Sequence, residues 1–271
     1  SGGQRHAPRD AGEPLVERFA TFHDLAGKHV FITGGGAGIG ASLSEGFLAQ
    51  GASVSFVQRS DSSAFVADMA AKYGNAPLFI QCDITDIAAL QAAIAQAVDA
   101  FGPVNVLVNN AANDTRHSLA EITPESWDAG QNVNLRPHVF GAQAVAPGMA
   151  AAGGGSIINF SSISYMMGNA GYPGYVAAKA GITGLTRGLA RELGPQKIRV
   201  NALMPGWVLT ERQMKLWATE EGLAAHLEKQ CLKEHLAPRD VVDATLFLAS
   251  DAARMITAQA LVVDGGTVVT G

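Results

Sequence analysis

The chain contains few cysteines, little charge and no long apolar run. Only two of its 271 residues are cysteine, which excludes a disulfide framework and a four-ligand zinc site, so we expect a cytoplasmic protein without a bound metal. Lys and Arg number 19 against 24 Asp and Glu, which leaves no basic surplus for nucleic acid or a membrane surface. The most apolar stretches, 88–101 and 139–152, are interrupted before the roughly 18 residues of a membrane span. We expect neither a nucleic-acid partner nor a membrane span.

Hydrophobic residues, by contrast, make up 48% of the chain, and 31 residues are glycine. That balance excludes an intrinsically disordered chain and indicates close-packed elements joined by tight turns. Residues 1–24 are polar, rich in Gly, Pro and Arg, and lack the apolar stretch of a signal peptide, so we interpret them as an N-terminal arm or a cloning scar. Because no repeat or break in composition follows, the sequence predicts one domain over residues 25–271.

From Leu25 onward, short β-branched and apolar runs alternate with alanine-rich stretches of helical periodicity. This alternation predicts βαβ units with right-handed crossovers, and therefore an α/β domain with a doubly wound, mostly parallel seven-stranded Rossmann sheet. The expected strands are His29–Thr33, Ser53–Val57, Leu78–Cys82, Val104–Asn109, Ser156–Phe160, Arg199–Leu203 and Ala260–Val263. The expected helices are Ile39–Gln50, Ser62–Tyr73, Ile87–Phe101, Pro124–Ala152, Pro173–Leu193 and Arg239–Ala249. The polar segment 210–236 interrupts the alternation, and we expect it to form a helical substrate lid.

A glycine-rich turn joins the first expected strand to the first expected helix, with the sequence TGGGAGIG at residues 33–40. Gly34, Gly38 and Gly40 allow the backbone to turn sharply and to approach a pyrophosphate, while the N-terminus of the following helix faces the anion. A glycine pattern alone also fits a plain strand-to-helix turn. Its place in the first βα unit favours a dinucleotide site.

The second expected strand ends where a dinucleotide-binding domain distinguishes NAD from NADP. An acidic residue there accepts hydrogen bonds from a free 2′-hydroxyl, whereas arginine suits a 2′-phosphate. Gln58 stands in place of the acid and Arg59 follows it, so we expect NADP to be preferred, with NAD as the alternative. Asp61 favours that alternative unless it caps the next helix.

Tyr175 and Lys179 are four residues apart in an expected helix and therefore share one face. A cation within about 4 to 6 Å of a phenol favours the phenolate and lowers the pKa, so the pair can act as a base. Taken alone, this spacing is more often a solvated helix face. Serines and a second tyrosine precede Tyr175, and chemistry alone does not choose among Ser161, Ser162 and Ser164.

The motifs together resemble those of the short-chain dehydrogenase/reductase family, over a match from about residue 25 to the C-terminus. In order they are TGGGAGIG, CDIT at 82–85, NNAA at 109–112, NVNL at 132–135, Ser162, YVAAK at 175–179 and PGWVLT at 205–210. The resemblance implies an enzyme that uses NAD(P) to move a hydride between nicotinamide and an alcohol or carbonyl carbon. One departure is Ala112, where the family commonly has glycine.

The resemblance also implies roles for single residues. Tyr175 exchanges the proton of the reacting group, and Ser162, thirteen positions earlier, hydrogen-bonds the reacting oxygen. Lys179 lowers the pKa of Tyr175 and binds the nicotinamide ribose, and Asn134 holds a water that links Lys179 to solvent. The implied cofactor-binding residues are Gly34, Gly38, Ile39, Gly40, Arg59, Asp83, Ile84, Asn110, Ala111, Tyr175, Lys179, Val208 and Thr210.

A narrower resemblance concerns the substrate. Segments such as NNAANDTRHSLAEITPESWD and NVNLRPHVFGAQAVAPGM are similar to bacterial aldose 1-dehydrogenases, which oxidise xylose, arabinose or galactose at the anomeric carbon to a lactone. We therefore expect a homotetramer and a small-molecule substrate, a sugar. The residues expected to bind it are Asn113, Ser162, Ser164, Asn169 and Tyr175. Asp114, Arg116 and His117 either join them or form a salt-bridged loop or a subunit contact.

Three features depart from the sugar-oxidising group: Gln58, the flexible and apolar segment Tyr165–Asn169, and the chain end VVDGGTVVTG. They keep open a reductase of the same family that acts on a 3-oxoacyl thioester or another secondary alcohol. A third alternative is a non-catalytic module that senses a dinucleotide.

Overall fold

Seven strands form one sheet in the computed structural model of the chain, which describes residues 19–270. The strand order is β3-β2-β1-β4-β5-β6-β7, and every pairing is parallel. The strands are β1 (His29–Thr33), β2 (Ser53–Gln58), β3 (Leu78–Gln81), β4 (Val106–Asn109), β5 (Gly155–Phe160), β6 (Ile198–Pro205) and β7 (Ala260–Val263). The order reverses between β1 and β4, which confirms the expected doubly wound α/β fold.

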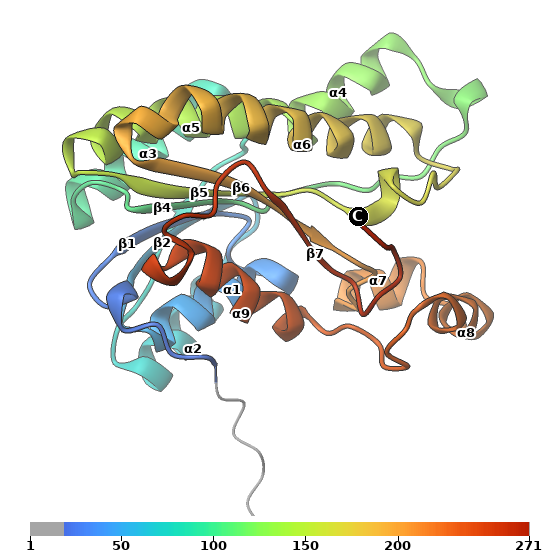
Figure 1. Cartoon of the computed structure of the whole chain (residues 1–271), viewed down its shortest axis with the longest axis horizontal. Helices are drawn as coiled ribbons and strands as arrows, with labels where there is room; N and C mark the ends of the chain where they lie inside the picture. Colours follow the sequence, from blue (N-terminus) through green and yellow to red (C-terminus); the bar gives the residue numbers. More distant parts are fainter. Residues whose placement is uncertain (1–18, 271) are drawn as a thin grey trace, which may run out of the picture.

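Helices cover both faces of the sheet (Figure 1). One layer contains α1 (Gly38–Ala49), α2 (Ser63–Tyr73) and α9 (Val242–Ala249); the other contains α3 (Ile87–Phe101), α4 (Pro124–Asn134), α5 (Arg136–Ala151) and α6 (Pro173–Leu193). Each layer has its own apolar core, with Phe47 and Phe56 buried on one side and Leu107 and Ile157 on the other. Because both faces are covered, the central strands are continuously apolar rather than alternating.

The expected helix over 124–152 is two helices, with the break at Leu135 (φ −124, ψ −50). Pro137 lies in the first turn of α5, where its missing N–H removes a bond that a continuous helix would need. The expected helix over 239–249 begins instead as a 3₁₀ turn, Pro238–Val241, which leads into α9.

The 210–236 segment forms two short helices, α7 (Glu211–Leu216) and α8 (Glu220–Lys229), which extend from one end of the molecule (Figure 1). A bridge between Val208 and Leu236 closes the base of this excursion. The helical content therefore matches the expectation, and the role of the segment as a lid stays a prediction.

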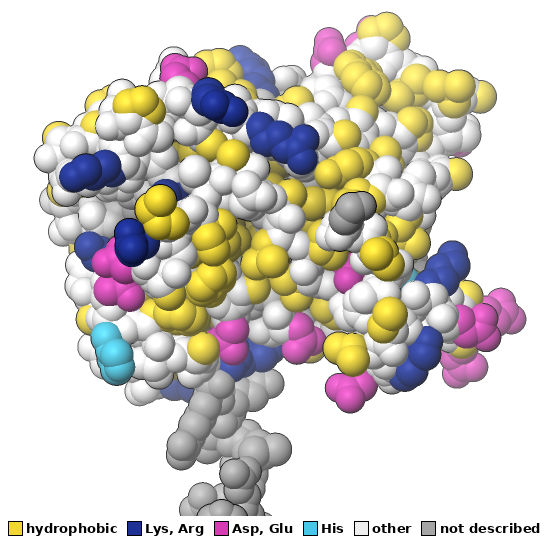
Figure 2. Space-filling model, in the orientation of Figure 1, with side chains coloured by type: hydrophobic (Ala, Val, Ile, Leu, Met, Phe, Trp, Pro, Cys, Tyr) yellow, Lys and Arg dark blue, Asp and Glu magenta, His cyan; other side chains and the backbone are white. Residues whose placement is uncertain are grey.

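At one edge of the sheet, β7 pairs only with β6, and its residues are half-buried. Hydrophobic side chains are spread over this face of the molecule (Figure 2). Met255 is 80% exposed beside it, and Val269 is 93% exposed. This edge is an apolar surface of the single chain.

The described part of the expected arm, residues 19–24, contacts the folded domain. The guanidinium of Arg239 lies 3.9 Å from the ring centre of Phe19, and the N–H of Ala20 donates to Asp243 at 2.9 Å. The rest of that arm, residues 1–18, lies outside the described residues. Within residues 19–270, no helix is long and apolar enough to cross a membrane.

Candidate active site

The carboxyl ends of four neighbouring strands open onto one cleft of about 960 Å³. Gly34 lies after β1, Asn110 after β4, Ser162 after β5 and Gly206 after β6, and all four line the cleft. Parallel sheets with a reversed strand order bind ligands at this edge. The fold therefore gathers motifs that are far apart in the sequence.

The glycine-rich turn forms the wall of the cleft beside β1. Gly34 and Gly38 have φ of +72° and +54°, which side chains other than glycine rarely adopt. A Cβ on Gly40 would collide with the carbonyl oxygen of Gly34. Helix α1 begins here without a side-chain cap, so its first N–H groups are available to an anion. This turn fits the diphosphate of a dinucleotide.

The end of β2 is tied to the same turn through Gln58. Its side-chain oxygen accepts a hydrogen bond from the N–H of Gly36 at 2.9 Å, and its amide donates to Ser60 at 2.9 Å. Arg59 is exposed beside it. The hydroxyl of Ser62 is buried next to Gly36 and has no hydrogen-bond partner among the described residues. Ser62 is a candidate cofactor contact that the sequence analysis missed.

Asp83 and Ile84 lie at the end of β3, further along the same edge and outside the residues that line the cleft. The carboxylate of Asp83 accepts the N–H and the hydroxyl of Thr85, at 2.9 and 2.8 Å. The pKa of Asp83 is lowered, chiefly by the N–H of Thr85 and also by the charge of Arg59. The guanidinium of Arg59 is therefore close enough to Asp83 to stabilise its carboxylate.

Tyr175 and Lys179 occupy the first turns of α6 and line the cleft. The ammonium of Lys179 lies 5.4 Å from the ring centre of Tyr175 and donates to the carbonyl of Phe160 at 2.8 Å. Ser162 follows Phe160 at the end of β5, and its hydroxyl accepts the N–H of Ser164 at 3.1 Å. Ser162, Tyr175 and Lys179 are thus brought together in one wall.

Burial dominates the titration of the tyrosine and the lysine. It lowers the pKa of Lys179 to about 7. Burial also raises the pKa of Tyr175, and the negative charge of Asp114 raises it further, whereas the hydrogen bond with Ser162 lowers it. Burial therefore outweighs the groups that lower the pKa of Tyr175 in the protein alone, and the expected lowering by Lys179 stays a prediction.

Comparisons with known proteins agree with this geometry. Residues 34–268 match the family model described as enoyl-(acyl carrier protein) reductase. The chain is 52% identical to a probable galactose dehydrogenase of Rhizobium meliloti, over 90% of this chain and 96% of the relative. It is 48% identical to a D-xylose 1-dehydrogenase of Caulobacter vibrioides, over 91% and 98%. The chain belongs to the short-chain dehydrogenase/reductase family.

A solved structure carries the same architecture. It is a blue fluorescent protein from a metagenomic library in complex with NADPH, with a TM-score of 0.82 and 34% identity over 91% of this chain and all of the neighbour. The family and the relatives make the chain an NAD(P)-dependent oxidoreductase acting on CH–OH groups, rather than a non-catalytic dinucleotide sensor.

In this short-chain dehydrogenase/reductase, Asn134 ends α4 with its side chain buried. The side chain accepts the N–H of Asn113 at 2.8 Å and donates to the carbonyl of the same residue at 2.9 Å. Its expected role as the holder of a relay water stays a prediction. The N–H of His138 donates to Leu135 at 3.1 Å, so the helix break leaves the carbonyl of Asn134 as the group that can face a water.

The residues expected to bind substrate are divided by the structure. Ser162, Ser164, Asn169 and Tyr175 line the cleft, whereas Asn113 does not. The amide of Asn169 donates to the hydroxyl of Tyr172 at 3.2 Å. His117 also lies outside the lining and packs beside Gly174 at the start of α6.

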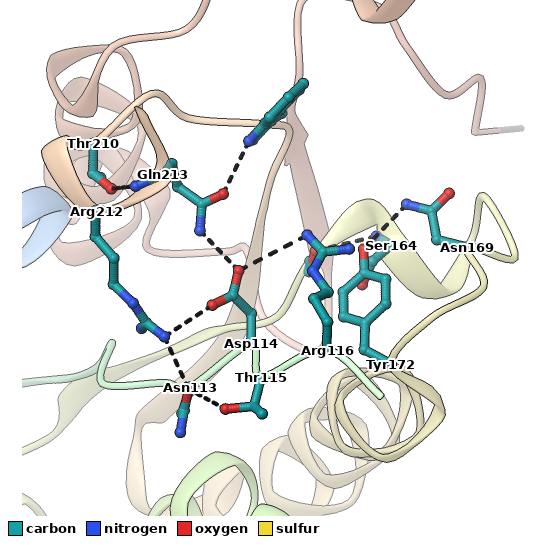
Figure 3. A network of polar contacts seen from close by, with 12 residues as sticks. Asn113, Asp114, Thr115, Arg116, Ser164, Asn169, Tyr172, Thr210, Arg212 and Gln213 are labelled. Carbon is teal, nitrogen blue, oxygen red and sulfur yellow. Dashed lines mark hydrogen bonds and ion pairs between the residues drawn. The ribbon is translucent and has the colours of Figure 1, made fainter. Parts of the chain in front are cut away.

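A polar network that the sequence analysis did not predict joins the loop after β4 to α7 (Figure 3). The carboxylate of Asp114 pairs with Arg212 at 3.3 Å and accepts the amide of Gln213 at 2.8 Å. Arg212 also donates to the side chain of Asn113 at 3.0 Å. Asp114 is therefore salt-bridged and also lines the cleft, and its contact with a substrate stays a prediction.

His138 was also missed. Its ring is buried, and neither ring nitrogen has a hydrogen-bond partner among the described residues. Burial, with the charge of Lys179, lowers the pKa of His138 to about 3. Across residues 19–270, no group of three or more His, Cys, Asp and Glu is placed to hold a metal ion.

Proposed function

We propose that the enzyme oxidises an aldose at C1 to its lactone. The observation that carries this proposal is a set of buried polar atoms on cleft-lining residues that have no hydrogen-bond partner among the described residues: Ser164 Oγ, Trp217 Nε1 and His226 Nε2. Buried polar atoms are normally paired, so we infer that these atoms pair with the hydroxyl groups of a bound ligand. The similarity to galactose and xylose dehydrogenases supports the same substrate class.

The chemistry is carried by side chains of α6 and of the end of β5. Tyr175 takes the proton of the C1 hydroxyl, and the Ser162 hydroxyl donates a hydrogen bond to that oxygen. Lys179, with a pKa of about 7, exchanges protons at neutral pH and so returns Tyr175 to its starting state. Bound NADP supplies the acceptor for the hydride that leaves C1. Asn134 acts by fixing the loop at Asn113 and through its free carbonyl.

NADP is the preferred cofactor in this proposal. Arg59 and the unpartnered hydroxyl of Ser62 supply the cation and donor that a 2′-phosphate needs, and a structural neighbour is in complex with NADPH. Gln58 is engaged by Gly36 and does not offer a carboxylate to a 2′-hydroxyl. The remaining cofactor-binding residues are Gly34, Gly38, Ile39 and Gly40 at the diphosphate, Asp83 and Ile84 at the adenine, and Asn110, Ala111, Val208 and Thr210 at the nicotinamide.

A second candidate function is reduction of a 3-oxoacyl thioester or another ketone. It is favoured by the acyl-carrier-protein substrate that the description of the matching family model names and by apolar side chains near the cleft. Met214 and Leu216 on α7 are each 50% exposed, and Met166 is 38% exposed. An acyl chain would cover such a surface.

A substrate panel tests the two candidates. Galactose, xylose and arabinose are assayed for oxidation, and a 3-oxoacyl thioester for reduction, each with NADP(H) and NAD(H), by the absorbance of reduced nicotinamide. The proposal expects oxidation of at least one aldose, faster with NADP. Reduction of the thioester without oxidation of any aldose would replace the first candidate by the second.

The proposed enzyme is a cytoplasmic homotetramer. Its edge strand β7 is half-buried in the single chain and is flanked by the exposed Met255 and Val269, a surface that a second copy would cover. Cys82 and Cys231 are both free, which supports a reducing compartment. Light scattering tests the assembly, and a monomeric mass would refute it.

A further inference from the structure

Side chains from three separate segments form a connected series along one wall of the cleft. The guanidinium of Arg116, in the loop after β4, lies 3.8 Å from the ring centre of Tyr172 and 5.1 Å from that of Trp217, which follows α7. The rings of Tyr172 and Tyr175 stack with centres 5.3 Å apart and planes inclined by 15°. The ammonium of Lys179 then lies 5.4 Å from the Tyr175 ring. The series leads from the 210–236 segment to the catalytic pair.

A carboxylate ties this series to α7 a second time (Figure 3). Asp114 lies 4.0 Å from the guanidinium of Arg116 and also holds Arg212 and Gln213 of α7. Gln213 in turn accepts the indole N–H of Trp207 at 3.0 Å. The same carboxylate therefore contacts the arginine that covers Tyr172 and the helix that borders the cleft.

We propose that Arg116 is a positioning residue for Tyr175: its guanidinium holds the Tyr172 ring against the Tyr175 ring, and α7 sets the guanidinium through Asp114 and Trp217. The inference rests on the proposed function, in which Tyr175 exchanges the proton. A planar guanidinium stacks on an aromatic face, which an ammonium does less well. Tyr172 is buried, so the stack confines the Tyr175 ring from one side. Displacement of α7 therefore loosens the phenol and slows proton exchange.

Charge acts along the same series. The charged and titratable groups that act on Tyr175 are Asp114 and Arg116 from the loop after β4, and Tyr172, which precedes α6. Lys179 also lies close to its ring. The pKa of Tyr175 is raised by Asp114 and lowered by Arg116. Loss of the guanidinium therefore has two separable effects, on ring position and on titration.

Conservative and disruptive variants separate the two effects, assayed with any substrate of the panel that is turned over. Arg116→Lys keeps the charge and loses the planar stack, so we expect kcat to fall about 10-fold with KM nearly unchanged. The kcat of Tyr172→Leu should fall by a similar factor. Tyr172→Phe keeps the ring, so its kcat should stay within about 3-fold of the parent. Arg116→Gln should also move the acidic limb of the kcat/KM profile to higher pH.

A matched control is Arg136→Gln, which removes another guanidinium placed over an aromatic ring, 5.7 Å from the centre of Phe140 and outside the cleft lining. We expect it to keep the parent kcat and pH profile. If α7 acts through Arg116, the double variant Trp217→Ala with Tyr172→Leu should lose no more kcat than the more impaired single variant. Both substitutions remove ring contacts of the same guanidinium, so their effects should not add.

Two results would overturn the inference. One is a parent-like kcat and pH profile in Arg116→Lys, Arg116→Gln and Tyr172→Leu, with thermal melting showing that they fold. The other is a loss confined to KM, which would make Arg116 a substrate contact. Tyr175→Phe distinguishes failure of this inference from failure of the proposed function. Turnover that survives in Tyr175→Phe refutes the role of Tyr175 itself. If Tyr175→Phe is inactive while the Arg116 variants match the parent, only the positioning role of Arg116 is refuted.

Discussion

The side chain of Lys179 on α6 is hydrogen-bonded to the backbone of Phe160 at the end of β5, at 2.8 Å. The hydroxyl of Ser161 donates back to the carbonyl of Lys179 at 2.7 Å. These two bonds fix α6 against the strand that carries Ser162, so the serine and the lysine hold one relative position. The proposed chemistry depends on that position because Ser162 and Tyr175 must reach the same oxygen.

The rate of aldose oxidation should rise with pH. Burial raises the pKa of Tyr175, and oxidation needs its deprotonated form, so the fraction of competent enzyme grows as pH increases. Lys179, with a pKa of about 7, also becomes able to accept a proton above neutrality. We expect kcat/KM for oxidation to increase from about pH 6 to about pH 9, and kcat/KM for lactone reduction to fall over the same range. A flat oxidation profile would contradict the assignment of Tyr175.

Arg59→Asp should shift the cofactor preference toward NAD. The change removes the cation proposed to bind the 2′-phosphate and places a carboxylate where it can accept the 2′-hydroxyl. We expect the ratio of kcat/KM with NADP to that with NAD to fall by about 10-fold or more. Arg254→Asp, at an exposed position between α9 and β7, changes the same charge and should leave the ratio unchanged. An unaltered ratio in Arg59→Asp would remove Arg59 from the site.

Gly40→Ala should abolish cofactor binding. The added Cβ would collide with the carbonyl oxygen of Gly34, so the turn must open, at a cost of about 1–3 kcal/mol in the free energy of unfolding. Gly130→Ala in α4 is the control, because nothing lies within 4 Å of a Cβ there; it should gain roughly 0.5–1 kcal/mol. Urea unfolding and titration of NADPH fluorescence measure both effects. Normal NADPH binding by Gly40→Ala would disprove the assigned turn.

His138→Gln should make the protein less sensitive to acid. The pKa of His138 is lowered from 6.5 to about 3 in the folded state, so between these values the unfolded chain binds a proton that the folded chain does not. Stability is therefore lost as pH falls below about 6.5, by up to ~1.4 kcal/mol for each pH unit. The variant lacks this contribution, and its urea midpoint should fall less between pH 7 and about pH 5. Parallel curves for the two proteins would refute the buried neutral histidine.

Local patterns determine much of this fold. Strands β1 and β7 and helices α3 and α6 have the expected bounds, because apolar periodicity and flanking Gly or Pro are local signals. The break at Leu135 was missed although Pro137 is a local signal for it, because the apolar pattern continues across the break.

The site was predictable only where motifs end strands. Ser162 and Tyr175 meet because β5 and α6 are neighbours in a doubly wound fold. The contact of Gln213 with Asp114 spans 99 residues and has no periodic signal. The raised pKa of Tyr175 depends on how deeply tertiary packing buries the phenol, which spacing to Lys179 does not report.

The most direct test is the rate of NADPH formation from galactose and xylose by the parent enzyme and by Tyr175→Phe, with NADP binding measured in both. We expect the parent to oxidise at least one of these sugars to its lactone. Tyr175→Phe should bind NADP normally and lose about 10²–10⁴-fold in kcat. Sugar oxidation that continues at the parent rate in Tyr175→Phe would contradict the proposed mechanism.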